Sequence, residues 1–149
     1  VARFKSVGVN CSKEVVNKLR KLVQDTPNYV QMACFHLVAE GIDEVNESKI
    51  QNVLRTIVKQ NAYSYQTLLN SLSSVQQRAL RLAAVESEGI FSKELLEKYE
   101  IPSGPALASS IKSLRRKQIL DEGVAKGKVV FDDPLFAIWL RIEFQSSIV

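Results

Sequence analysis

The sequence has 149 residues, of which 46% are hydrophobic and 24% are charged. That suits one ordinary domain or two small ones with a real core. No apolar run reaches about 18 residues, so we expect no membrane-spanning helix and no membrane partner. No charged-then-apolar leader is seen, so we do not expect secretion. Because residue 1 is a valine, we expect the chain to be a piece of a longer protein or a processed one.

The two cysteines, Cys11 and Cys34, lack the spacing of metal ligands. Cys34 falls on the apolar face of a predicted helix, and we expect two free thiols in a reducing cytoplasm. The single histidine, His36, has no partner cysteine or carboxylate at ligand spacing. We therefore expect no metal site.

Residues 1–60 are predicted to form a helical subdomain of three amphipathic helices. The first follows a Ser12 cap, the second begins at Pro27 and ends at Gly41, and the third begins near Glu47. Apolar residues recur at i, i+3/i+4 and i+7, as in helices that pack on neighbours. Proline suits a first helical turn because its missing N–H costs nothing there.

Residues 61–72 are predicted to be a helical connector, and residues 73–149 a second domain that opens with three helices. The first helix, in 73–87, is capped by Ser73 or Ser74 and ends before Gly89. A short helix follows Ser92. The third helix is expected at 105–117 after a tight glycine-containing turn, which is the arrangement of a helix-turn-helix. Its inward residues are expected to be Leu107, Ile111 and Leu114.

Two short β segments on either side of the turn GVAKG predict a hairpin over 119–132. Asp133 and Pro134 then start a last helix, as its N-cap and first residue. Three helices followed by a hairpin indicate a winged helix-turn-helix. The expected fold is therefore mainly α: an N-terminal helical, lid-like bundle followed by a winged helix-turn-helix domain with a small β-hairpin wing.

The net charge of +4 is concentrated late in the chain, because residues 105–128 carry six Lys/Arg against two Asp/Glu. A helix fits the major groove of DNA, with its N-terminal side chains near the bases. Cations at its C-terminal end and on the wing are placed for phosphates. The candidate nucleic-acid-binding residues are Ser109, Ser110, Lys112, Ser113, Arg115, Arg116 and Lys117 on the helix, and Lys126 and Lys128 on the wing.

Two other interpretations of this basic helix stay open. The helix dipole alone favours cations at a helix C-terminus, and winged helices also bind proteins. The N-terminal end of the helix has no Arg, Asn or Gln, the residues best suited to bidentate base reading. Contact with the DNA backbone needs only positive charge, so we favour it over sequence-specific binding.

Motifs of catalysis are not found. The sequence contains no G-x-x-x-x-G-K-[ST], no G-x-S-x-G and no H-E-x-x-H. Glu94, Glu97 and Glu100 recur every third residue and are expected to form a solvated face. We expect no enzyme activity in this chain.

Three motifs in order resemble the C-terminal region of the archaeal-type (STAND-like) ATPases of the AAA+ class, where a helical lid and a winged helix follow a P-loop core. The stretch DTPNYVQMACFHL is similar to the lid signature G-x-P-x-Y-x-Q, with Asp25 in place of its glycine. LLNSLSSVQQRALRLAAVE is similar to the first helix of the family's winged helix, and VFDDPLFAIWLR to its closing element. The matching residues are Pro27, Tyr29, Gln31, Leu72, Gln76, Leu80 to Ala84, Phe131, Asp133, Pro134, Phe136, Trp139 and Leu140.

This resemblance implies that the chain is a non-catalytic fragment that couples nucleotide state to a DNA or protein partner. It implies a preceding P-loop ATPase domain as partner, with ATP and Mg bound in the full-length protein and no cofactor in the fragment. Pro27 and Tyr29 would lie near bound nucleotide. A simple helix start at Pro27 explains the same residues, and a carboxylate at Asp25 disfavours a nearby phosphate.

The alternative to this fragment is a stand-alone winged-helix transcription regulator with an N-terminal helical dimerisation module. That hypothesis predicts a symmetric dimer and a palindromic DNA site. The Asp-Asp-Pro…Trp-Leu ending favours the ATPase fragment, because a simple regulator has no obvious need of it.

Overall fold

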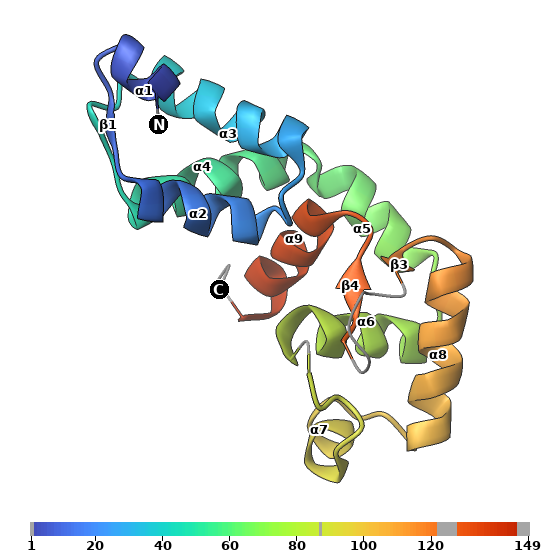
Figure 1. The fold of residues 1–149 in the computed structure, drawn as a ribbon. Coiled ribbons are helices and arrows are strands. Elements are labelled where there is room, and N and C mark those ends of the chain that lie inside the picture. The colour runs from blue at the N-terminus through green and yellow to red at the C-terminus, as the bar shows by residue number, and fades with distance from the viewer. Residues whose placement is uncertain (1, 87, 122–127, 146–149) are drawn as a thin grey trace. The chain divides into compact units, whose positions relative to one another are not determined.

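The computed structural model describes residues 2–86, 88–121 and 128–145. It divides the chain into two compact units, Val1–Asn61 and Ala62–Val149 (Figure 1). The described residues are mainly helical, with two short strand pairs. The predicted fold class, a helical bundle followed by a winged helix, is confirmed.

The first unit contains the three predicted helices and three short elements that the sequence did not reveal. The N-terminal helix and a parallel pair of two-residue strands are the additions, with Asn10 paired to Glu44 and Cys11 to Val45. Strands of two residues are too short to show alternation, so no sequence pattern marks them. The elements are α1 (Ala2–Ser6), β1 (Asn10–Cys11), α2 (Lys13–Leu22), α3 (Pro27–Ala39), β2 (Glu44–Val45) and α4 (Glu47–Gln60).

Caps explain where these helices begin. The Ser12 hydroxyl accepts a hydrogen bond from the Val15 N–H (3.2 Å), and the Asn46 side chain accepts one from the Lys49 N–H (2.9 Å). Each satisfies a backbone donor that the first turn leaves unpaired. The start of α3 differs, because its N-cap Thr26 makes no side-chain cap bond and Pro27 occupies the first position instead.

Helix α3 is apolar on more than one side. Ala33 and Leu37 are buried, whereas Val38 is exposed. Met32 and Phe35 also face outward, and Phe35 is 71% exposed. The other large buried side chains of the unit come mainly from α2, its C-cap and α4, and include Leu19, Val23, Ile50, Leu54 and Ile57.

The second unit has the element order of a winged helix. The predicted hairpin is present and antiparallel, and the structure pairs Leu120 with Phe131 and Asp121 with Val130. The turn that the sequence placed between the strands, GVAKG at 123–127, lies outside the described residues. The elements are α5 (Ala62–Asn70), α6 (Ser74–Glu86), α7 (Lys93–Lys98), α8 (Gly104–Arg116), β3 (Leu120–Asp121), β4 (Val130–Phe131) and α9 (Pro134–Gln145).

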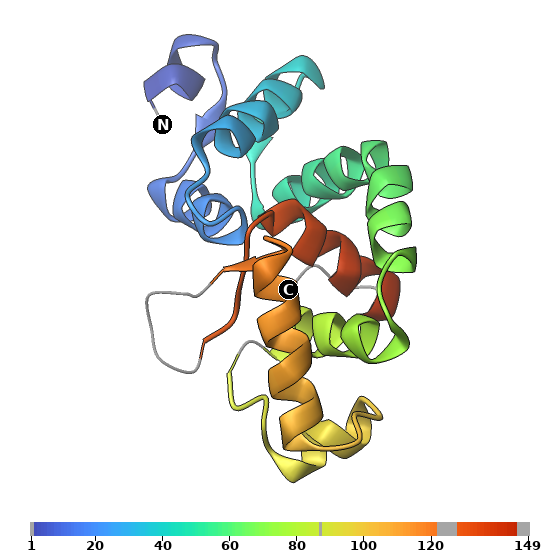
Figure 2. The same ribbon diagram turned by 90° about the vertical axis from the view of Figure 1, so that its right-hand side faces the viewer.

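Helix α9 is the centre of this unit. All residues from 134 to 140 are buried, since the helix packs against α5, α6 and β4 (Figures 1 and 2). The Asp133 carboxylate accepts a hydrogen bond from the Leu135 N–H at 3.0 Å and another from the Tyr65 hydroxyl at 3.1 Å. One carboxylate therefore starts α9 and ties it to α5. The rings of Tyr65, Phe131, Phe136 and Trp139 pack together beside this contact.

Helices α6, α7 and α8 form the helix-turn-helix part. Ser73 and Gln76 make a reciprocal capping box at the start of α6, and Ser92 and Ser103 cap α7 and α8 through their hydroxyls. Helix α8 begins one residue earlier than predicted, at Gly104, and ends at Arg116. Its inward residues are those predicted: Leu107, Ile111 and Leu114 are buried.

No helix among the described residues is both long enough and apolar enough to cross a lipid bilayer.

The end of α7 generates a stability prediction. Glu100 has a left-handed backbone (φ +56°), a conformation that costs a non-glycine residue roughly 1 kcal/mol. We expect Glu100→Gly to raise the free energy of unfolding by about 0.5–1 kcal/mol, since glycine adopts this conformation freely. Urea unfolding followed by the fluorescence of Trp139, the single tryptophan, measures it in the second unit.

Glu97→Gly is the matched control, because it removes the same charge from an exposed position in the last turn of α7, where the backbone is helical. There glycine should lower the free energy of unfolding by about 1 kcal/mol. If both variants unfold at lower urea than the unmodified chain, the backbone at Glu100 is not the constraint described above.

Candidate nucleic-acid interface

Helix α8 presents one continuous exposed face that is small at its start and cationic at its end. Pro105, Ala108 and Ser109 are exposed in the first half. Lys112 and Arg116 are exposed in the second half, one turn apart and therefore on the same side. Lys117 follows directly as the exposed C-cap residue.

Two serines that the sequence pattern assigned to nucleic-acid contact face the protein instead. Ser110 is only 7% exposed and lies between the buried residues Leu107 and Leu114. The half-buried Ser113 accepts a hydrogen bond from the Gln76 side-chain amide at 3.0 Å, which ties α8 to α6. The expected DNA contact of Ser110 is therefore corrected to a core position, and Ser113 is a structural contact between two helices.

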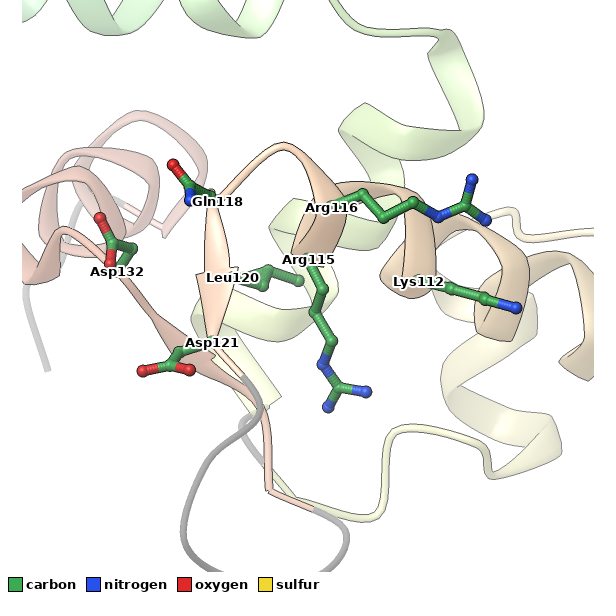
Figure 3. A pocket seen from close by; sticks show the side chains of 7 residues that line it. All are labelled: Lys112, Arg115, Arg116, Gln118, Leu120, Asp121 and Asp132. Atoms are coloured by element: carbon green, nitrogen blue, oxygen red, sulfur yellow. The ribbon is translucent and has the colours of Figure 1, made fainter.

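Arg115 lines a groove between the C-terminal half of α8 and the wing strands. The groove has a volume of about 610 Å³, and its walls differ in charge. Figure 3 shows Lys112 and Arg116 pointing away from the strands, while Asp121 and Asp132 lie on the strand side. The Arg115 Nε is buried without a hydrogen-bond partner among the described residues. The groove is lined by Lys112, Arg115, Arg116, Gln118, Leu120, Asp121 and Asp132.

Among the residues that the structure describes, no carboxylate neutralises the cations of α8. Residues 104–117 contain no Asp or Glu. Within the described part of the chain, Lys112, Arg115, Arg116 and Lys117 form no ion pair. Because unpaired surface charges act together on an approaching polyanion, this end of α8 is a cationic surface.

The wing contributes one described cation. Lys128 lies before β4 and forms an exposed ion pair of 2.9 Å with Glu88, in the segment between α6 and α7. The hydrogen bond and charge of Lys128 lower the pKa of Glu88, and those of Glu88 raise the pKa of Lys128. The other predicted wing contact, Lys126, lies outside the described residues.

The predicted nucleotide-contacting residues lie on the first turn of α3, in the other unit. Pro27 is exposed and Tyr29 is half-buried. Asp25 has a left-handed backbone (φ +56°) and receives an ion pair from the Arg20 Nε at 2.6 Å. The resemblance expects glycine at this position, and the conformation is one that favours glycine. Arg20 offsets the charge that the carboxylate adds there.

The described residues contain no group of three or more His, Cys, Asp or Glu side chains that could hold a metal ion. Cys11 and Cys34 are free thiols, and burial raises the pKa of each. A raised pKa keeps a thiol protonated and unreactive.

Sequence reasoning missed the contacts that orient α8. The hydrogen bond from Gln76 to Ser113 joins residues 37 positions apart, and no local pattern marks such a pair. The Ser73–Gln76 capping box matches the local pattern S-x-x-Q. The hydrogen bond that the Gln76 side chain also donates to Ser113 has no such local pattern. The ion pair of Lys128 with Glu88 likewise joins distant segments.

Comparison with known proteins gives one family. Residues 63–142 match the family model described as "Probable winged helix domain". Neither the search of curated proteins nor the search of solved structures found a match. The family match gives no support to a P-loop ATPase parent. It spans more than half of the 149 residues, and the chain belongs to this winged helix domain family.

Proposed function

We propose that the chain binds duplex DNA through the cationic face of α8. The observation that carries the proposal is the set of four cations at the end of this helix, none of which is in an ion pair within the described residues. A phosphate backbone supplies the missing negative charges at closely spaced positions. The set comprises Lys112, Arg115, Arg116 and Lys117.

The winged helix frame supports the same proposal. An α-helix fits the major groove of B-form DNA, and the second of the two helices in a helix-turn-helix is the one that enters it. Here that helix is α8, which is tied to α6 by the Gln76–Ser113 hydrogen bond. The hairpin β3–β4 follows α8 directly, so Lys128 on the wing adds a second phosphate contact.

A protein partner is the second candidate for this surface. The helix dipole favours cations at a helix C-terminus whatever the partner. An acidic protein would be recognised by the same charges, but its binding would show no preference for duplex DNA. Competition between a duplex and the candidate protein distinguishes the two.

From the resemblance, we further propose that the chain is the C-terminal region of a P-loop ATPase and reports nucleotide state to its DNA contact. The left-handed backbone at Asp25, before Pro27, supports this because the lid signature has glycine there. Pro27 and Tyr29 would then lie near ATP and Mg bound by the preceding domain. A stand-alone regulator would instead be a symmetric dimer with a palindromic site.

The ATPase proposal has a direct test. We expect the coding sequence upstream of the Val1 codon to encode G-x-x-x-x-G-K-[ST] between a strand and a helix. The purified chain should hydrolyse no ATP, because it holds no phosphate-cradling loop. A start codon immediately before Val1, or turnover by the chain alone, would refute the proposal.

Removal of the α8 charges should weaken duplex binding. We expect Lys112→Gln, Arg116→Gln and Lys117→Gln together to lower affinity at least tenfold at about 50 mM salt. The slope of log K against log salt should fall by about 3, near one unit per lost phosphate contact. Fluorescence anisotropy with a labelled 20-base-pair duplex, measured across a salt series, tests both quantities.

Lys13→Gln, Lys21→Gln and Lys59→Gln form the matched control. These exposed lysines lie on α2 and α4 in the first unit, and their loss changes net charge by the same amount. Affinity and slope should remain near those of the unmodified chain. Equal losses in the two triple variants would mean that overall charge, rather than α8, attracts DNA.

Glu88 should weaken DNA binding, because its ion pair with Lys128 competes with a phosphate for that lysine. We expect Glu88→Gln to raise duplex affinity by about fivefold at most, since an exposed ion pair is weak. Glu143→Gln, an exposed change of equal charge on α9, is the control and should have a smaller effect. Equal gains in the two variants would show that Lys128 is not specifically released.

A further inference from the structure

We infer that α8 recognises B-form duplex DNA by its backbone and shape, with little discrimination of base sequence. This inference rests on the proposed function and specifies the substrate of the same surface. It follows from which side chains the exposed face of α8 offers along its length, and from the charge on the two walls of the neighbouring groove.

The half of α8 that would meet base edges has no side chain for reading them. Bidentate recognition needs Arg or Lys for guanine and Asn or Gln for adenine. Residues 104–111 contain none of these four residue types. The Ser103 hydroxyl caps the helix, and Ser110 is buried. Ser109 is left as the exposed hydroxyl on this half, and a single hydroxyl discriminates weakly among bases.

The half of α8 that carries charge is placed for phosphates. Lys112 and Arg116 point away from the wing strands (Figure 3). The exposed Asp132 lines the strand wall of the groove, and its carboxylate repels a phosphate. The charge on the two walls therefore confines a DNA backbone to the helix side. Phosphate contacts of this kind orient the protein but carry no sequence information.

Single-stranded nucleic acid does not fit this surface. Proteins that bind single strands stack bases on exposed aromatic rings, and α8 has no aromatic residue. Exposed aromatic residues of this unit include Tyr63 on α5, Phe91 before α7 and Phe144 on α9. One face of the Phe144 ring is covered by the Arg81 guanidinium, 4.0 Å from the ring centroid.

Duplex RNA is also disfavoured. Its A-form major groove is deep and narrow, so side chains on a helix cannot read it. The B-form major groove admits a whole helix, and the small residues Pro105, Ala108 and Ser109 let α8 approach closely. B-form duplex is therefore the nucleic acid that this face fits.

The test uses the full chain and a panel of labelled 20-base-pair DNA duplexes of unrelated sequence. One sequence is also prepared as a single strand and as an RNA duplex. We expect the DNA duplexes to bind within about fivefold of one another, because each missing bidentate base contact would have discriminated about five- to 150-fold. The single strand and the RNA duplex should bind at least tenfold more weakly. Selection from a random duplex library should return no consensus.

Two variants sharpen the test. Arg116→Ala should weaken every duplex by the same factor, as expected of a phosphate contact. Ser109→Ala should change each affinity less than twofold, and loss of binding to one duplex alone would identify it as a base reader.

The outcomes separate this inference from the proposed function. A sequence bound 100-fold more tightly than the others, or tighter binding of the single strand or RNA duplex, would overturn the inference and leave nucleic-acid binding by α8 intact. Absence of duplex binding at low salt would overturn the proposed function, and the inference with it.

Discussion

The burial of the first two turns of α9 is the constraint on which the second unit depends. Seven consecutive buried residues, 134–140, leave these turns no face for solvent, so the surrounding elements must cover them on every side. Asp133 starts the helix and also binds Tyr65 on α5. Helix α6 packs on another side of α9 and also carries α8. The packing of this buried core therefore sets the orientation of the cationic surface on α8.

Packing also decides which side chains of α8 can act. Leu107, Ile111 and Leu114 face inward, and Ser110, which lies on the same side of the helix, is buried with them. The hydrogen bond from Gln76 fixes the helix at Ser113. The side chains left outside are small in the first half and cationic in the second. A helix held in this way exposes positive charge to a polyanion but exposes no side chain suited to reading bases. Packing therefore determines which contacts α8 can make with DNA.

Periodicity and caps predicted the main elements, because helices of nine residues or more repeat their apolar face several times. The helices after Ser12, Ser73 and Ser92 begin where those predicted serines cap them. The pattern could not reveal the parallel pair β1–β2, whose strands have two residues each. For the candidate site, the sequence located the cationic end of α8 but misassigned Ser110. A serine next to the apolar face of a helix is expected to face solvent from the sequence alone, and only the position of the neighbouring helix shows that it is buried. The groove and the Gln76–Ser113 contact could not be predicted, because each joins segments that lie apart in the sequence.

Mapping the contact surface on the intact chain tests the central claim most directly. Backbone amide chemical shifts of the 149-residue chain would be followed during titration with a short DNA duplex. The account predicts that the largest shifts fall on residues 104–117 and on the wing strands β3 and β4, while α3 stays unchanged. Shifts concentrated on α3 or spread evenly over both units would contradict it.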